Sequence, residues 1–205
     1  MGGKGATTRR RDHCNLPASV YAGGIVIERA LLPVFDTARF AVRQAKLEDA
    51  AEIARVQTRS WQTSYRGILP DSILDTMNVE RRTALRRDIL RDPSGLNLVA
   101  YDVTHRDLVG FCNAGPSRHQ EPLVGELYEI YIVEYAKRYG LGRELFESAQ
   151  DWCRENEMTA MVVWVLENNH HARRFYDAMG GAPAGRVQSA VRGYPVVELS
   201  YRYQL

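Results

Sequence analysis

The chain lacks the features that mark disulfide-stabilised, metal-binding and membrane-spanning proteins. Its three cysteines are an odd number without metal-site spacing, which fits a protein of the reducing cytoplasm better than a secreted disulfide framework. Its five histidines form neither an HExxH motif nor a cluster with cysteine, so we expect no metal. The most apolar early stretch, Leu16–Phe35, is interrupted by Glu28 and Arg29 and predicts neither a signal peptide nor a membrane span.

A strongly basic body is also absent. The net charge is +2, but residues 1–12 alone carry +3, so the rest of the chain carries −1. This balance argues against nucleic acid as the main partner. A nucleic-acid-binding protein that uses Arg9–Arg11 is a weaker alternative to a solvated N-terminal tail.

What is present is the pattern of one α/β domain. We expect residues 1–39 to be an N-terminal extension, partly disordered, and residues 40–205 to form the domain. Periodicity predicts strands 40–45, 98–103, 108–113, 126–133, 161–166 and 196–203, with one further strand possible at the end, and helices 47–61, 79–90, 141–154 and 170–179. A helix separates strands 126–133 and 161–166, so these two should be parallel neighbours.

The most informative feature is the turn Gly140-Leu141-Gly142, which separates the strand Glu126–Val133 from the amphipathic helix Leu141–Arg154. A helix N-terminus has unpaired N–H groups and a partial positive charge. Glycines there let a phosphate approach the backbone closely. Three basic residues flank the turn, namely Lys137, Arg138 and Arg143. The turn therefore predicts a site for a phosphorylated ligand.

Three sequence blocks resemble the GNAT superfamily of acyl-CoA N-acyltransferases over residues 40–203. The run 137–142 (KRYGLG) is similar to the family's acetyl-CoA signature Q/R-x-x-G-x-G/A, with Lys137 where Gln or Arg is usual. Residues 164–176 look like the family's strand followed by N-x-x-A-x-x-F-Y, with Asn169 on the Asn and Tyr176 on the Tyr. Residues 115–118 and 125–128 are similar to many bacterial members. Three blocks in the right order are more specific than one glycine motif.

The resemblance implies the GNAT fold, a mixed, twisted α/β sheet of six to seven strands flanked by helices, with two central parallel strands that splay apart. It implies acetyl-CoA as co-substrate, with the pantetheine arm along the end of strand 126–133 and the pyrophosphate on the glycine turn. The residues expected to bind acetyl-CoA are Ile132, Val133, Lys137, Arg138, Tyr139, Gly140, Leu141, Gly142, Arg143 and Asn169. Asn169 is also expected to cap its helix.

The resemblance further implies transfer of acetyl to a primary amine by direct attack in a ternary complex. Glu126 falls where several members carry a catalytic Glu and is the candidate base, against the alternative of a solvent-facing strand carboxylate. Glu129 is the reserve, on the opposite face unless a bulge changes which side chain points inward, and water is the third option. Tyr176 is the expected general acid, against a packing role. A backbone N–H near Val133 is expected to hold the oxyanion.

The sequence predicts less about the part of the site that binds the acceptor amine. Trp61, Tyr65 and Glu129 are the candidate substrate-binding residues, with plain packing as the alternative for the two aromatic rings. The acceptor amine belongs to an unidentified small molecule or peptide. A non-catalytic acyl-CoA-binding sensor or scaffold is the alternative function. A homodimer is possible, with the last strand Val196–Tyr203 as the pairing element.

Overall fold

The computed structural model describes residues 39–119 and 121–205, and the predictions made for residues 1–38 lie outside this part of the chain. In chain order the elements are β1 Phe40–Gln44, the 3-10 turn η2 Leu47–Asp49, α1 Ala50–Ser64, α2 Asp71–Asp75, α3 Val79–Arg91, β2 Leu96–Asp102, β3 Asp107–Pro116, β4 Val124–Ile132, the 3-10 turn η3 Glu134–Ala136, α4 Leu141–Glu155, β5 Ala160–Leu166, α5 His170–Ala178, β6 Ala182–Val191 and β7 Tyr194–Gln204. The elements expected from periodicity are present within three residues of their expected ends.

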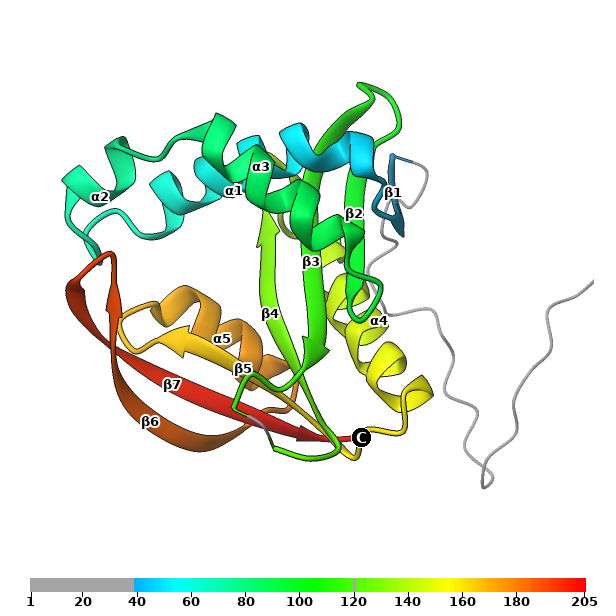
Figure 1. Ribbon diagram of the computed structural model, residues 1–205, viewed down its shortest axis with the longest axis vertical. Helices are drawn as coiled ribbons and strands as arrows, with labels where there is room; N and C mark the ends of the chain where they lie inside the picture. The colour runs from blue at the N-terminus through cyan, green and yellow to red at the C-terminus, as the bar shows by residue number, and fades with distance from the viewer. Residues whose placement is uncertain (1–38, 120) are drawn as a thin grey trace, which may run out of the picture. The chain divides into compact units, whose positions relative to one another are not determined.

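The strands form one seven-stranded sheet in the order β1-β2-β3-β4-β5-β7-β6 (Figure 1). β4 and β5 run parallel, and the other neighbouring strands are antiparallel. The helix α4 connects the two parallel strands, as the βαβ pattern predicts. The expected mixed α/β sheet is therefore confirmed.

The last strand does not lie at an edge of this sheet. β7 pairs with β5 on one side and with β6 on the other, so both of its hydrogen-bonding edges are occupied within the chain. The expectation that residues 196–203 could pair with a second copy is therefore wrong, and β6 is the edge strand at this end of the sheet. The sequence pattern does not define β6, because its first residues (APAG) lack apolar alternation and most of its side chains are exposed.

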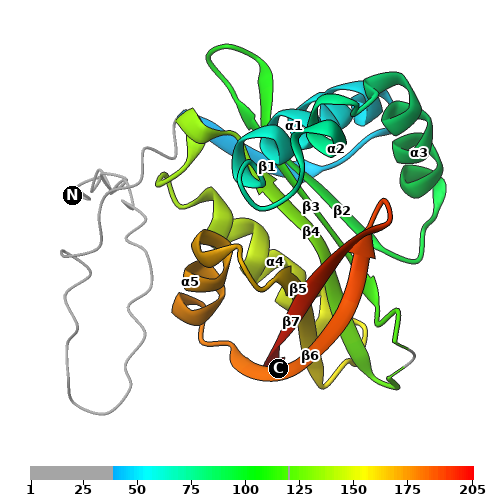
Figure 2. The same cartoon turned by 90° about the vertical axis from the view of Figure 1, so that its left-hand side faces the viewer.

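Helices cover both faces of the sheet around β3 and β4 (Figures 1 and 2). On one face, α1 packs on both strands and α3 packs on α1. On the other face, α4 packs on the same strands, and the thiol of Cys112 in β3 lies 3.6 Å from the carbonyl oxygen of Leu145 in α4. The buried side of α4 has helical spacing and consists of Leu141, Leu145, Phe146, Ala149 and Cys153.

The two parallel strands pair over only part of their length. Register partners run from Val124–Leu127 on β4 to Ala160–Val163 on β5. Beyond that point β4 continues on β3 and β5 continues on β7, so the strands diverge (Figure 1). The splayed central strands implied by the family resemblance are thus present, and they leave backbone of both strands without a neighbour between them.

A bulge in β4 changes which of its side chains share a face. Asn113 of β3 lies opposite Glu129, whereas the next residue of β3, Ala114, lies opposite Leu127. Tyr128 is therefore the extra residue of β4. Because of it, Glu126 and Glu129 lie on the same face of the sheet, the one covered by α1 and α3. Simple alternation, which places them on opposite faces, is wrong here.

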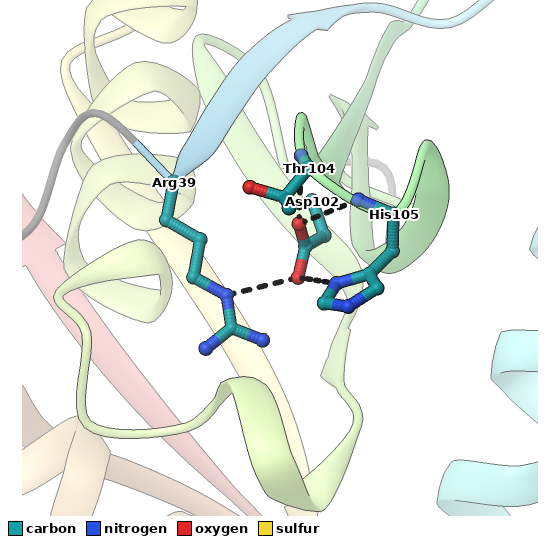
Figure 3. A network of polar contacts seen from close by, with 4 residues as sticks. All are labelled: Arg39, Asp102, Thr104 and His105. Carbon is teal, nitrogen blue, oxygen red and sulfur yellow. Dashed lines mark hydrogen bonds and ion pairs between the residues drawn. The ribbon is translucent and has the colours of Figure 1, made fainter.

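The turn between β2 and β3 closes around a buried carboxylate, Asp102 (Figure 3). Its Oδ1 accepts hydrogen bonds from the backbone N–H groups of Thr104 (2.9 Å) and His105 (3.1 Å). Its Oδ2 contacts Nε of Arg39 (3.0 Å) and Nδ1 of His105 (2.9 Å). Burial alone raises the pKa of Asp102, but these hydrogen bonds outweigh it and hold the pKa well below its ordinary value. The ionised carboxylate thus stabilises the turn.

Candidate active site

A large pocket opens where β4 and β5 diverge. Its volume is about 1370 Å³, and its walls come from the two strands, from α1 and α3, from the turn before α4, from α5 and from the β6–β7 hairpin. Pockets for one drug-sized ligand rarely exceed roughly 1,000 Å³. The space is therefore large enough for a co-substrate and a second ligand together.

The glycine turn forms one end of this pocket. Gly140 precedes α4 with φ of 86°, a left-handed conformation in which a side chain would be strained. Gly142 lies against the ring of Phe175, which a Cβ atom would approach to 3.3 Å. Five residues of the turn line the pocket, namely Lys137, Arg138, Gly140, Gly142 and Arg143. The start of a 15-residue helix and three basic side chains thus meet in the cavity.

Not every residue expected to bind acetyl-CoA faces the pocket with its side chain. Ile132 lines it, but Val133 and Leu141 are buried in the core, and the ring of Tyr139 packs on Phe40 at 5.0 Å between ring centres. The N–H of Val133 donates to the carbonyl of Val109 (2.8 Å). That N–H is therefore already paired, and the oxyanion role expected near Val133 cannot fall to it.

The helix α5 brings Asn169 and Tyr176 to the same pocket. The side chain of Asn169 accepts a hydrogen bond from the N–H of Ala172 (3.1 Å), which confirms the expected cap. Tyr176 is 6% exposed and packs against the rings of Phe146 and Phe175. Burial raises the pKa of its phenol well above the ordinary value. Tyr176 therefore keeps its proton at neutral pH. The same side chain packs against the core and lines the pocket.

The carboxylate of Glu126 is fully buried and faces Arg118, so the alternative of a solvent-facing carboxylate is wrong. The backbone N–H of Arg118 donates to Oε2 (2.9 Å) and its Nε donates to Oε1 (2.9 Å). The guanidinium of Arg118 also lies 4.7 Å from the ring centre of Tyr128. Arg118 lines the pocket and covers Glu126 behind it. The role of Glu126 as a base stays a prediction.

The carboxylate of Glu129 lines the pocket itself, within a group of buried polar side chains. Nε2 of Gln57 in α1 donates to Oε1 (2.6 Å), and the guanidinium of Arg86 in α3 forms an ion pair with Oε2. Arg86 is 3% exposed and lies over the ring of Phe111 (4.8 Å to its centre). We call Gln57, Arg86 and Glu129 the Glu129 tier.

A second layer, which we call the Trp61 tier, consists of Trp61, Arg82 and Tyr131. Each lies one repeat along α1, α3 or β4 from a member of the Glu129 tier, four residues on a helix and two on the strand. Nε1 of Trp61 donates to the hydroxyl of Tyr131 (3.0 Å), and the guanidinium of Arg82 lies 5.0 Å from the ring centre of Trp61. Tyr65 contacts Trp61 edge-on at 5.1 Å between ring centres. The predicted acceptor residues Trp61, Tyr65 and Glu129 thus lie together.

Sequence reasoning missed several residues of the lining, namely Gln57, Arg82, Arg86, Arg118 and Trp164. A polar residue on the buried side of a helix is the signal that could have found Gln57 and Arg86. Trp164 lies in the pocket wall against the ring of His119 (4.8 Å between ring centres). No local signal distinguishes Arg118.

The model of the acetyltransferase (GNAT) family matches residues 56–180, which is more than half of the chain. The chain belongs to the GNAT family. It is therefore an acyltransferase by class, and the resemblance drawn from the three sequence blocks is confirmed.

Similar proteins agree with this membership. An uncharacterised N-acetyltransferase, YuaI of Bacillus subtilis, is 37% identical over 129 residues, which cover 62% of this chain and 72% of that protein. A mycothiol acetyltransferase of Rhodococcus opacus is 28% identical and covers 86% of this chain and 61% of its own length. The PaiA N-acetyltransferase of Thermoplasma acidophilum, solved in complex with coenzyme A, has the same fold, with a TM-score of 0.60, 17% identity and coverage of 80% and 99%.

The part of the chain that the structure describes, residues 39–119 and 121–205, has neither a metal-binding cluster nor a helix that could span a membrane. No three His, Cys, Asp or Glu side chains in that part of the GNAT chain come close enough together to hold a metal ion. Among the same residues, no helix has the length and apolarity needed to cross a membrane.

Proposed function

We propose that this GNAT protein transfers the acetyl group of acetyl-CoA to a primary amine by direct attack while both ligands are bound. The observation that carries the proposal is that one pocket is lined both by the glycine turn before α4 and by the Glu129 tier. One end therefore suits a pyrophosphate and the other suits an amine. YncA of Salmonella typhimurium, solved with acetyl-CoA and 18% identical with a TM-score of 0.60, supports the choice of co-substrate.

The turn at residues 137–143 is the proposed pyrophosphate site. Backbone N–H groups at the start of α4 would bind the phosphate oxygens, and Lys137, Arg138 and Arg143 would add positive charge. The end of β4 at Ile132 has no strand neighbour toward β5, so it can take the amide-bearing pantetheine arm as an added strand. The acetyl thioester supplies the acyl group, which the chain only has to position.

The amine must lose a proton before it attacks. A lysine-like amine has a pKa of about 10.4, so at pH 7 its deprotonation costs about 4.6 kcal/mol. Glu129 is the first candidate to accept this proton, directly or through water, because its carboxylate lies in the pocket wall. Gln57 and Arg86 hold that carboxylate in place. Glu126 is the second candidate and would have to act past Arg118.

The departing CoA thiolate must gain a proton. Tyr176 faces the same pocket from α5 and keeps its phenol protonated, because burial raises its pKa. It is the proposed general acid. Glu129 and Tyr176 thus approach the reacting groups from separate elements, β4 and α5.

Calorimetry with acetyl-CoA, followed by a thiol-release assay over a panel of amines, tests this function. We expect binding, and CoA release with at least one amine. Gly140→Ala should weaken acetyl-CoA binding at least tenfold, whereas Gly180→Ala, which carries the same backbone strain (φ 83°) at the end of α5, should not. Binding without CoA release from any amine would instead support a sensor or scaffold. No binding of acetyl-CoA would overturn the proposal.

A further inference from the structure

The acceptor wall of the pocket has a defined charge pattern, set by its two tiers. In the Glu129 tier, the guanidinium of Arg86 is neutralised by the carboxylate of Glu129. In the Trp61 tier, the corresponding place on β4 is taken by Tyr131, which carries no charge. Arg82 therefore occupies the same kind of position as Arg86 without the matching carboxylate.

Arg82 forms no ion pair with any carboxylate of residues 39–119 and 121–205. Its Nε atom is buried and has no hydrogen-bond partner in this part of the chain. Glu198 of β7 also lines the pocket but does not pair with it. A half-buried guanidinium with an unsatisfied N–H is costly unless an anion completes it. Because Arg82 lines the pocket, an anionic group of a bound ligand can supply the missing partner.

The surroundings of Arg82 fit a small planar anion. Its guanidinium lies 5.0 Å from the ring centre of Trp61, and a guanidinium edge presents two parallel N–H groups that match a carboxylate. Arg192 of the β6–β7 hairpin adds a second positive charge. Burial and this neighbouring charge both lower the pKa of Arg82. A second ammonium group at this place would meet two like charges, which disfavours diamines and polyamines.

Hydrogen-bond acceptors lie one helical turn from Arg82, in the Glu129 tier and on Asn113, which lies opposite Glu129 on β3. Besides the Glu129 carboxylate, the buried oxygens Oε1 of Gln57 and Oδ1 of Asn113 have no donor among the described residues. Both residues line the pocket and are more than nine-tenths buried. Three acceptor groups of this kind suit an amine, which has only donors when charged.

The distance between the two tiers limits the size of the ligand. They are one turn of α1 and α3 apart, which corresponds to about 6 Å along a helix axis. An amine and a carboxylate separated by one to a few carbon atoms can hydrogen-bond to both tiers at once. We propose that the acceptor is an amino acid or a close analogue, with its amine at the Glu129 tier and its carboxylate on Arg82. This inference rests on the proposed acetyltransferase function and names its substrate class.

The test uses reaction products, which bind without turnover. The full chain, saturated with CoA, is titrated calorimetrically with the N-acetylated forms of the twenty common amino acids and with their carboxamides. We expect at least one carboxylate to bind ten times more tightly than its amide. Arg82→Gln and Arg82→Met should abolish this ratio, whereas Arg81→Gln, an exposed change of the same charge on the same helix, should preserve it. Unchanged acetyl-CoA affinity in each variant shows that the fold is intact.

Equal binding of acids and amides, no binding of any of them, or a ratio that persists in both Arg82 variants would overturn the inference. If the thiol-release assay still showed transfer to amines without a carboxylate, the acetyltransferase function would stand and this substrate class would be wrong. A chain that does not bind acetyl-CoA would remove both.

Discussion

At the scale of single residues, the pocket separates the proposed proton donor from the proposed proton acceptor. Tyr176 keeps its proton because burial of its side chain raises the pKa of the phenol. Glu129 lies on the opposite wall, where Arg86 and Gln57 contact its two oxygens. Groups of opposite function in different environments are what acid–base chemistry at one pH requires.

Replacement of Tyr176 by Phe should lower kcat about 10² to 10⁴-fold, because the thiolate then leaves without a proton donor. The affinity for CoA should change less than about twofold, since the packing of the ring is retained. Steady-state kinetics and calorimetry measure the two quantities. Tyr194→Phe, at an exposed tyrosine of β7, is the matched control. An unchanged kcat would remove Tyr176 from the mechanism.

The two carboxylates of β4 can be told apart by parallel substitutions. Glu129→Gln should lower kcat at least about tenfold at neutral pH, with a partial recovery as pH rises and the free amine becomes more abundant. Glu126→Gln should mainly destabilise the fold, by about 1–3 kcal/mol, because Arg118 loses the charge that it covers. Rates across pH 6–10 and urea unfolding provide the comparison. The reverse pattern would assign the base to Glu126.

At the scale of elements, the turn between β2 and β3 depends on the ionised side chain of Asp102. Its pKa in the folded chain lies below that of the unfolded chain, which is about 3.9. Its stabilisation is therefore complete above that value and is lost as pH falls toward the folded-state pKa. Asp102→Asn should cost about 1–3 kcal/mol at pH 7 and should reduce the loss of stability between pH 5 and pH 3.

Urea unfolding at pH 7, 5 and 3 checks this expectation. Asp88→Asn, an exposed carboxylate of α3, serves as the control and should leave the pH dependence unchanged. If the Asp102 variant had the same slope as the wild type between pH 5 and pH 3, the carboxylate would not contribute through its ionisation.

How far the sequence predicts the elements depends on how local each signal is. The glycine turn, the cap at Asn169 and the βαβ unit are encoded in consecutive residues and were predicted. The Glu129 tier was not predicted as a unit, because its members come from three elements distant in the chain. β6 was expected only as a possible further strand without bounds, for another reason. Most side chains of this edge strand are exposed, so its sequence lacks the alternating apolar pattern that would predict a strand.

At the scale of the whole molecule, direct transfer predicts that no acetyl-enzyme forms. Cys112 and Cys153 are buried, and burial raises their pKa values to about 12 and about 11, so neither supplies a thiolate at neutral pH. Initial-rate plots with acetyl-CoA and amine should therefore give intersecting lines. Mass spectrometry of the chain after acetyl-CoA alone should show no added acetyl group, in the wild type and in Cys14→Ser. Parallel lines with an acetylated chain would contradict direct transfer.

The extra residue Tyr128 determines which side chains of β4 face α1 and α3 in the acceptor wall of the pocket. Upstream of it, even-numbered side chains of β4 point toward α1 and α3, and downstream of it odd-numbered ones do. If β4 kept Tyr128 but ran without the bulge, regular alternation from Glu126 would turn Ile130 and Ile132 toward α1 and α3 and would turn Glu129 and Tyr131 toward α4. A bulge of one residue in a single strand thus places a carboxylate and a phenol on this face of the sheet, where regular alternation would place two isoleucines.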